Sequence, residues 1–271
     1  MRAECAALRY GGRRLGLVPT MGALHEGHLS LLRAARSQCD VVVASIFVNP
    51  TQFGPQEDLA KYPRPFARDS ELLRAEGVDL LFAPSVEEMY PAGAMTYVNV
   101  EALSERLCGR SRPGHFRGVA TVVSKLFHVV QPEAAFFGQK DAAQLAVIRT
   151  MVRDLLLPVE IVACPIVRES DGLALSSRNV YLSSEQRRQA LTLYRSLSLV
   201  KQLYEGGERD VARLMGAGVE EFSREPGARL DFLEIVDAES LEPLETARPG
   251  ALVAVAGFVG STRLIDNVVL A

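Results

Sequence analysis

Residues 15–48 read LGLVPTMGALHEGHLSLLRAARSQCDVVVASIFV, and this stretch decides the fold class. Residues 15–18 form an apolar run followed by a Pro-Thr-Met-Gly turn, which predicts a buried strand. Residues 28–39 carry apolar side chains at helical spacing, so we expect a helix there. The β-branched run 41–48 is typical of a strand buried on both faces, as in a parallel sheet. The stretch therefore predicts a β–α–β unit with a right-handed connection.

The same alternation continues as far as residue 164. The expected elements are helix 69–76, strand 79–83, helix 119–130, strand 134–137, helix 141–155 and strand 159–164. Helices and strands that alternate in this way are typical of a doubly wound parallel sheet. We therefore predict an α/β protein whose ligands bind beyond the carboxyl ends of the parallel strands.

After about residue 165 the pattern changes. The expected elements there are a polar, Ser-rich loop at 175–181, helices at 184–205 and 209–224, and strands at 230–236, 251–256 and 262–269. This order predicts a smaller C-terminal α+β domain with an antiparallel sheet. We place the boundary near residue 166, so the predicted domains are 1–166 and 167–271.

Composition and charge exclude several classes of protein. The chain has 271 residues, 48% hydrophobic and 23% charged, close to average for a soluble protein. A net charge of −3 argues against wholesale binding of nucleic acid. The four cysteines are scattered, with no CxxC pair, which indicates a reducing compartment. No signal-peptide pattern follows Met1, and no apolar run reaches the roughly 18–20 residues of a membrane span. We expect a cytoplasmic protein that binds neither membranes nor nucleic acid.

The turn after the first strand reads PTMGALHEGH over residues 19–28. Gly22 and Gly27 permit tight turns, and the N-terminus of the following helix suits a phosphate. His25 and His28 are three residues apart, so both imidazoles can lie on one side of a helical turn and donate hydrogen bonds to phosphate oxygens. Two other interpretations are a helix cap and half of a metal site. The metal site is weaker, because no nearby Cys or carboxylate set completes it.

Two further segments carry polar groups that suit a small ligand. The segment FVNPTQFG follows the second strand, and its Asn49 and Gln52 offer uncharged, directional groups that suit a hydroxylated, carboxylated molecule. The segment SRPGHFRGV precedes a helix, and its Arg112 and His115 can contribute to a carboxylate or phosphate site. The alternatives are an ordinary polar loop for the first segment and a solvated basic loop for the second.

Two polar turns near the predicted domain boundary complete the set. In FFGQKDAAQ, Lys140 offers a compact cation to phosphates, whereas Asp141 stands where a helix N-cap is favoured and can be structural. In PIVRESDGLALSSRN, Ser176, Ser177 and Arg178 form a plausible phosphate clamp on a loop that could close over a nucleotide. The alternative for this second turn is a solvated, Ser-rich hinge.

The string PTMGALHEGH contains the HxGH signature of the HIGH superfamily of nucleotidyl transferases, and as a whole it resembles the start of the pantothenate synthetases. Other strings similar to that family follow in its order: YPR from Tyr62, RPGHFRGV from Arg112, GQKD from Gly138, LSSRN from Leu175 and TRLIDN from Thr262. The resemblance covers about residues 15–267. Many members have methionine at the position of Leu175, a swap that conserves volume. The resemblance implies a Rossmann-like ATP- and pantoate-binding domain followed by a C-terminal α+β lid domain.

The resemblance also implies a reaction, the ATP-dependent condensation of (R)-pantoate with β-alanine to pantothenate through a pantoyl adenylate, with release of AMP and pyrophosphate. It further implies a magnesium requirement and a homodimer. The implied catalytic residues are His28, His25, Lys140, Ser176, Ser177 and Arg178. The implied ATP-binding residues are Met21, Gly22, Ala23, Leu24, His25, Glu26, Gly27, His28, Gly138, Gln139, Lys140, Asp141, Val167, Leu175, Ser176, Ser177 and Arg178. Pantoate and β-alanine would contact Gln52, Gln144, Asn49, Arg112 and His115. The metal ligands stay unknown, with Asp69 as one possibility.

Two other functions fit parts of the pattern. Another HxGH-type enzyme could transfer an adenylyl or cytidylyl group to a small acceptor, and a non-catalytic nucleotide-binding protein could carry the same motifs. Gln52 and Gln144 together with the RPGHF segment favour the ligase. A substrate panel separates these functions, because a transferase leaves a nucleotidylated product rather than an amide.

Overall fold

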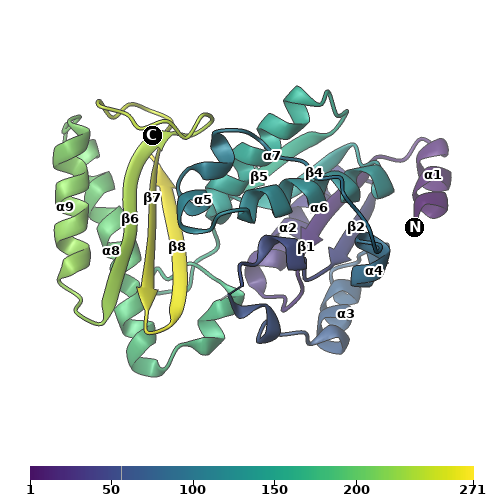
Figure 1. The fold of residues 1–271 in the computed structure, drawn as a ribbon, viewed down its shortest axis with the longest axis horizontal. Coiled ribbons are helices and arrows are strands. Elements are labelled where there is room, and N and C mark those ends of the chain that lie inside the picture. The colour runs from purple at the N-terminus through teal and green to yellow at the C-terminus, as the bar shows by residue number, and fades with distance from the viewer. Residues whose placement is uncertain (56) are drawn as a thin grey trace.

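The computed structural model describes residues 1–55 and 57–271. Its larger sheet has five parallel strands in the order β3-β2-β1-β4-β5 (Figure 1). They are β1 (Leu15–Thr20), β2 (Val41–Ile46), β3 (Leu80–Phe82), β4 (Ala134–Gly138) and β5 (Glu160–Cys164). The predicted doubly wound parallel sheet is therefore confirmed. Its strand order reverses between β1 and β4, the place where such sheets bind ligands.

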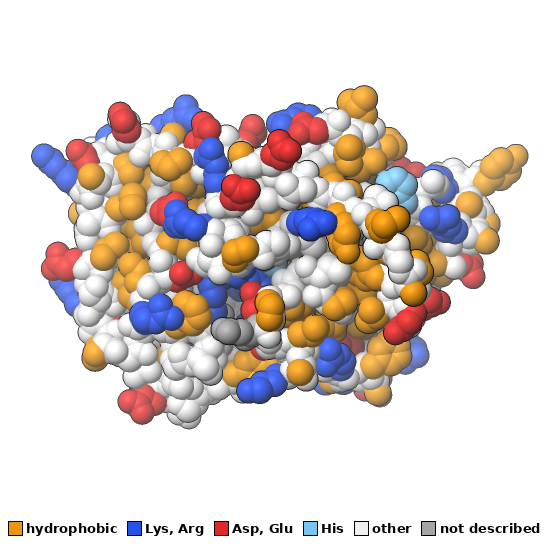
Figure 2. All heavy atoms as spheres, viewed as in Figure 1, with side chains coloured by type: hydrophobic (Ala, Val, Ile, Leu, Met, Phe, Trp, Pro, Cys, Tyr) orange, Lys and Arg blue, Asp and Glu red, His pale blue; other side chains and the backbone are white. Residues whose placement is uncertain are grey.

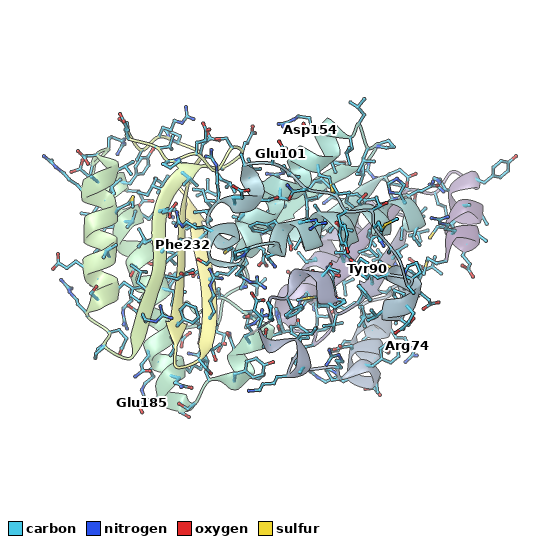
Figure 3. All side chains as sticks on the ribbon, in the orientation of Figure 1. Arg74, Tyr90, Glu101, Asp154, Glu185 and Phe232 are labelled. Atoms are coloured by element: carbon cyan, nitrogen blue, oxygen red, sulfur yellow. The ribbon has the colours of Figure 1, made fainter. Side chains whose placement is uncertain are left out.

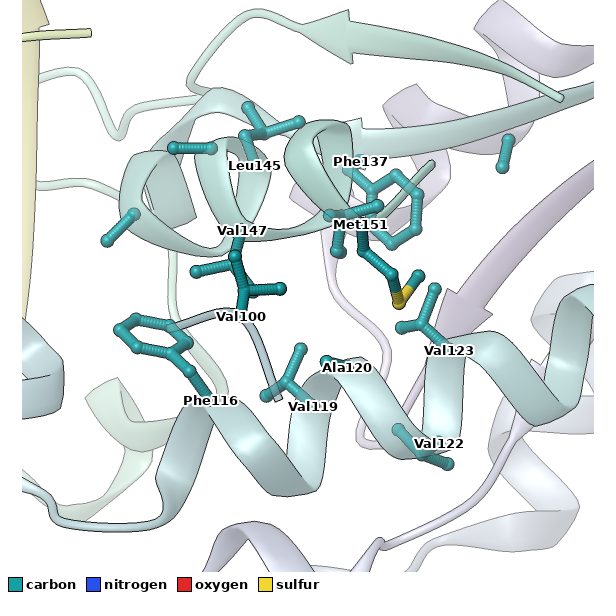
Figure 4. Packing of buried hydrophobic residues seen from close by; sticks show 14 of the residues in the cluster. Val100, Phe116, Val119, Ala120, Val122, Val123, Phe137, Leu145, Val147 and Met151 are labelled. Atoms are coloured by element: carbon teal, nitrogen blue, oxygen red, sulfur yellow. The ribbon is translucent and has the colours of Figure 1, made fainter. Parts of the chain in front are cut away.

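Helices cover both faces of this sheet. Because successive side chains of a strand point to opposite faces, each strand contributes to two apolar clusters, one on each face. The longer helices are α2 (Glu26–Gln38), α3 (Phe66–Ala75), α6 (His115–Val130) and α7 (Ala142–Asp154). Leu17, Val43 and Phe137 belong to one apolar cluster with α6 and α7, and Figure 4 shows Phe137 between these helices. Val18 and Phe136, their neighbours in sequence, belong to a second cluster with α2. The continuous apolar runs of the sequence follow from this burial on both sides.

Three helices begin two to four residues earlier than predicted. α2 begins at Glu26 because His25 caps it, and α6 begins at His115 directly after Gly114, whose φ is 82°. α3 begins at Phe66, directly after a proline. The helix α1 (Arg2–Tyr10) was not predicted. Apolar periodicity alone placed these starts too late, because the residue that sets each start lies just before the helix: His25, Pro65 or Gly114.

The C-terminal unit is the predicted α+β arrangement. It contains α8 (Ser184–Glu205), α9 (Val211–Ser223) and an antiparallel sheet of β6 (Ala228–Asp237), β7 (Ala251–Val259) and β8 (Thr262–Val269). Ser183 and Gln186 form a capping box, in which each side chain accepts the other residue's backbone N–H. The boundary predicted near residue 166 lies in the segment between β5 and α8 and stays a prediction.

The smaller sheet lies between α8 and α9 on one side and the first unit on the other (Figure 1). Leu233 and Val253 pack with α8 and α9. Phe232, labelled in Figure 3, and Ala254 point to the opposite face and join the apolar cluster of the larger sheet. The two units therefore share one continuous apolar interface, which positions the strand β8 beside the larger sheet's ligand-binding edge.

Short helices and turns make up much of the remaining chain. They are α4 (Val86–Met89), α5 (Cys108–Ser111), and the 3₁₀ turns η1 (Pro50–Gln52), η2 (Asp58–Ala60), η3 (Leu103–Glu105), η4 (Gln139–Asp141) and η5 (Ser177–Tyr181). Acidic and basic side chains are interspersed on the face seen in Figure 2. Among the described residues, none of the helices has the length and apolar character needed to cross a membrane.

Candidate active site

A cleft lies where the carboxyl ends of β1, β2 and β4 meet the segment that leads to the C-terminal unit. All five polar segments singled out in the sequence contribute to its lining. The predicted site residues that line it are Met21, His25, Gly27, His28, Asn49, Gln52, Arg112, His115, Gly138, Lys140, Asp141, Gln144, Val167, Leu175, Ser176, Ser177 and Arg178. The described lining does not include Gly22, Ala23, Leu24, Glu26, Gln139 and Asp69.

The turn after β1 is supported by Asp69 of α3. One Asp69 carboxylate oxygen accepts the N–H of Ala23 at 2.7 Å, and the other accepts the N–H of Leu24 at 2.9 Å. The turn needs this support, because Gly22 and Ala23 both have positive φ, at 80° and 52°. Asp69 is 1% exposed, and both of its carboxylate oxygens accept backbone N–H groups of the turn that carries His25. Among residues 1–55 and 57–271 there is no cluster of three or more His, Cys, Asp or Glu that could hold a metal.

His25 and His28 form the capping box of α2. The backbone N–H of Gly27 donates to Nδ1 of His25 at 3.1 Å, and the backbone N–H of His25 donates to Nδ1 of His28 at 3.3 Å. Because each Nδ1 accepts a backbone proton, a neutral ring must carry its own proton on Nε2. The capping role and the phosphate-binding role are therefore compatible: Nδ1 orders the helix start, and Nε2–H is a donor for a ligand.

Burial keeps both rings neutral. It lowers the pKa of His25 to about 4, and the positive charge of Lys140 acts in the same direction. Burial also lowers the pKa of His28 to about 3, with His25 and Lys140 as further causes. At neutral pH the pair can donate hydrogen bonds but cannot release the second proton of an imidazolium. This geometry favours electrostatic stabilisation over acid catalysis by these residues.

Acidification should destabilise the ligand-free protein through these rings. His25, His28 and His115 have lowered pKa values in the folded state, so below about pH 6.5 the unfolded chain binds more protons than the folded chain. We expect each ring to reduce the free energy of unfolding by about 1–2 kcal/mol between pH 7 and pH 5. Urea titrations across this range measure the slope, and His28→Gln should flatten it. An equal slope in this variant would contradict the assignment.

Arg112 and His115 converge on the backbone of Gln52. The Nδ1–H of His115 donates to the Gln52 carbonyl at 2.8 Å, and Nη2 of Arg112 donates to it at 3.3 Å. Arg112 also forms an ion pair with Glu57. Burial and the adjacent Arg112 lower the pKa of His115 to about 4. These two residues line the cleft as predicted, and their polar groups fix the position of Gln52.

Asn49 supports the same residue from its side chain. It is 1% exposed, and its Nδ2 donates to Oε1 of Gln52 at 3.0 Å and to the Gly118 carbonyl at 3.1 Å. Both N–H bonds of the amide are thus used inside the protein. Direct contact of Asn49 with a substrate stays a prediction, whereas its contact with Gln52 is a feature of the structure.

The turn that carries Lys140 is fixed by the C-terminal unit. Nδ2 of Asn267 in β8 donates to the carbonyls of Gln139 and Lys140, each at 2.9 Å, and Nε2 of Gln139 donates to Oδ1 of Asn267 at 3.2 Å. Asp141 occupies the N-cap position of α7 without a side-chain capping bond and lines the cleft. The sequence offered only the TRLIDN resemblance as a signal for Asn267, since its partners lie more than a hundred residues away.

The Ser-rich loop is tied to the segment after Gln52. Arg178 donates from Nε and Nη2 to the two carboxylate oxygens of Asp58, both at 2.9 Å. The hydroxyls of Ser177 and Tyr62 lie 3.2 Å apart, and Ser176 caps η5 by accepting the N–H of Arg178. Asp58 was not predicted as a site residue. Its role depends on a contact between distant segments, for which the local pattern contains no signal.

The comparisons with known proteins agree with this arrangement. The sequence model described as Pantoate-beta-alanine ligase matches residues 1–269. The pantothenate synthetase of Acidobacterium capsulatum is 62% identical over 261 residues, which are 96% of this chain and 87% of the relative. That of Moorella thermoacetica is 61% identical over 270 residues, or 100% and 95% of the two chains.

Solved structures extend the likeness to the fold. The crystal structure of pantothenate synthetase from Thermus thermophilus has a TM-score of 0.93 and 54% identity, covering 97% of this chain and 96% of that one. The structure of a pantoate-beta-alanine ligase from Francisella tularensis, in complex with beta-gamma ATP and β-alanine, has a TM-score of 0.79 and 34% identity, covering 98% and 95% of the two chains.

Proposed function

The chain belongs to the pantoate–β-alanine ligase family, and from this premise we propose how its cleft condenses (R)-pantoate with β-alanine at the expense of ATP. One observation carries the residue assignment: a pair of neutral histidines and Lys140 share a single cleft with Gln52 and Gln144. The first three groups suit phosphates, and the two amides suit hydroxyl, carboxylate and amine groups.

In the first half-reaction a pantoate carboxylate oxygen bonds to the α-phosphorus of ATP, and the bond from that phosphorus to the bridging oxygen of pyrophosphate breaks. Negative charge grows on the α-phosphate and on the leaving group. We assign the Nε2–H donors of His25 and His28 and the cation of Lys140 to this charge. Ser176, Ser177 and Arg178 are assigned to the ATP phosphates, for which Arg178 would exchange its contact with Asp58.

In the second half-reaction the β-alanine amine bonds to the pantoyl carbonyl carbon, the acyl–oxygen bond to AMP breaks, and the nitrogen gives up a proton. We assign Gln52 and Gln144 to hold the two reactants in contact, which is the proximity part of catalysis. The loop of Leu175 and the segment of Val167 would enclose the mixed anhydride and exclude water.

Magnesium fits this cleft as a companion of ATP. Of the described residues that line the cleft, Asp141 carries the only carboxylate, and Mg²⁺ commonly binds through one or two carboxylates together with substrate phosphates. Mg²⁺ would neutralise phosphate charge, and Asp141 would be its protein ligand. Asp69 does not fit as the magnesium ligand, because its carboxylate already accepts the backbone N–H groups of Ala23 and Leu24.

The assembly and cellular location are also proposals. The family resemblance supports a homodimer, which light scattering on the purified protein would test by a mass twice that of the chain. Buried, unpaired thiols at Cys5, Cys39, Cys108 and Cys164 support a reducing compartment such as the cytoplasm. Fractionation of cells that express the protein would test the location.

The reaction is tested by pyrophosphate release with ATP and magnesium, with pantoate and β-alanine supplied together and each omitted in turn. We expect AMP and pantothenate only when both substrates are present. Pyrophosphate formed with another acceptor, together with a nucleotidylated product, would replace the ligase by a transferase of the same superfamily. Folded protein that binds ATP and releases nothing would contradict the catalytic assignment itself.

A further inference from the structure

Tyr90, at the end of α4, approaches the substrate loop without lining the cleft. Figure 3 labels it in the first unit, and it is absent from the described lining. Its hydroxyl donates a hydrogen bond of 2.8 Å to Oδ1 of Asn49 and lies 3.1 Å from Oγ1 of Thr51. Tyr90 thus contacts the segment that carries Gln52 from outside the space assigned to substrates.

Backbone groups decide which way the Asn49 amide points. Its Oδ1 accepts the N–H of Thr51 at 3.4 Å, and its Nδ2 donates to the carbonyl of Gly118 at 3.1 Å. A backbone N–H can only donate and a carbonyl can only accept. If the Asn49 amide were rotated, its NH₂ group would face the N–H of Thr51 and its oxygen would face the carbonyl of Gly118. The Tyr90 hydroxyl adds a short bond to the same Oδ1 and strengthens this orientation.

The orientation of Asn49 in turn sets that of Gln52. The remaining N–H of Asn49 donates to Oε1 of Gln52 at 3.0 Å. The Gln52 carbonyl end therefore faces Asn49, and Nε2 lies on the other side, 3.3 Å from Sδ of Met21 in the cleft lining. Gln52 presents N–H donors to the cleft, which match the carboxylate, carbonyl and hydroxyl oxygens of a pantoyl group.

The Tyr90 ring is itself held in place. Nζ of Lys125 lies 4.1 Å from the ring centroid and donates to the carbonyl of Met89. The ring of Phe47 is 6.2 Å away between centroids. A ring that contacts an ammonium group and lies near an aromatic side chain can hold its hydroxyl at a defined point.

We propose that Tyr90 is a positioning residue for the pantoyl subsite, acting through Asn49 to keep the Gln52 amide directed into the cleft. This rests on the proposed role of Gln52 in substrate binding. The hydroxyl needs no contact with substrate for this effect, because a positioning error of one amide weakens every bond that the amide makes.

Tyr90→Phe removes the hydroxyl and keeps the ring. We expect kcat/KM for pantoate to fall about three- to tenfold, the effect of one lost hydrogen bond, while KM for ATP changes less than twofold. Steady-state kinetics with each substrate varied in turn measure this split. The matched control is Tyr97→Phe, since Tyr97 also has a cation over its ring, Arg117 at 4.0 Å, and is exposed. That variant should behave like the wild-type protein.

A double-mutant cycle tests the route through Gln52. In a Gln52→Ala background, Tyr90→Phe should cause no further loss of kcat/KM for pantoate, because the group it positions is gone. Additive losses, an equal rise in all KM values, or unchanged pantoate kinetics in a folded Tyr90→Phe protein would each overturn the proposal. If the wild-type protein made no pantothenate at all, the proposed function would fail instead, so the two failures are distinguishable.

Discussion

Replacing His28 by alanine is expected to lower the rate of pyrophosphate release by about 10²–10³-fold. Nδ1 of His28 accepts a hydrogen bond from the backbone N–H of His25, so the neutral His28 ring carries its proton on Nε2. A preorganised donor in a buried cleft contributes more to charge stabilisation than the same group in water. Single-turnover release of pyrophosphate from ATP and pantoate measures this step directly.

Two controls separate catalysis from folding in this variant. The loss of the capping bond should cost about 1 kcal/mol of stability, so the protein should remain folded at 25 °C by circular dichroism. His128→Ala, at an exposed position of α6, should keep wild-type rates. If a folded His28→Ala protein lost less than about tenfold in the first half-reaction, the assignment of His28 to the transition state would be wrong.

Gly118→Ala is expected to displace the backbone that carries Gln52 and so to weaken the use of pantoate. A Cβ on Gly118 would stand 2.4 Å from the carbonyl oxygen of Thr51 and 2.7 Å from the backbone nitrogen of Gln52. These are backbone atoms, so η1 must move away from α6 and take Gln52 with it. A displacement near 1 Å can cost about 10²-fold, which we expect in kcat/KM for pantoate. Overpacking should also lower the free energy of unfolding by about 1–3 kcal/mol.

The matched control is the same substitution in an open position. Gly216 lies in α9, and an added Cβ there would meet nothing within 4 Å. Gly216→Ala should leave activity unchanged and stabilise the helix by up to about 1 kcal/mol. Urea unfolding and pantoate kinetics on both variants give the comparison. Wild-type pantoate kinetics in Gly118→Ala would show that η1 can move without moving Gln52, and would contradict the argument.

The candidate site was predictable where residues that line the cleft also share a local pattern. The PTMGALHEGH, GQKD and LSSRN strings each stand at a turn beside a strand or helix end, and the structure brings them to one cleft. Asp58 and Tyr90 had no such signal, and Asn267 had only the TRLIDN resemblance. Tyr90 contacts Asn49, which is 41 positions away in the sequence. Asp58 contacts Arg178, 120 positions away, and Asn267 contacts Lys140, 127 positions away. Contacts at such separations depend on the fold.

Periodicity and turn chemistry alone determined the α/β class, the parallel sheet up to β5 and the change to a C-terminal α+β unit, because alternating helices and strands are typical of a parallel sheet and separate runs of helices and strands are not. The motifs also predicted residues that the structure places in the lining of one cleft. Only the tertiary structure decided how those residues are supported: Asp69 holds the histidine turn, Arg112 and His115 hold the backbone of Gln52, and Asn267 holds the turn of Lys140. The reason is physical. A buried polar group must find its partner in three dimensions, and the chain order does not specify which distant group that will be.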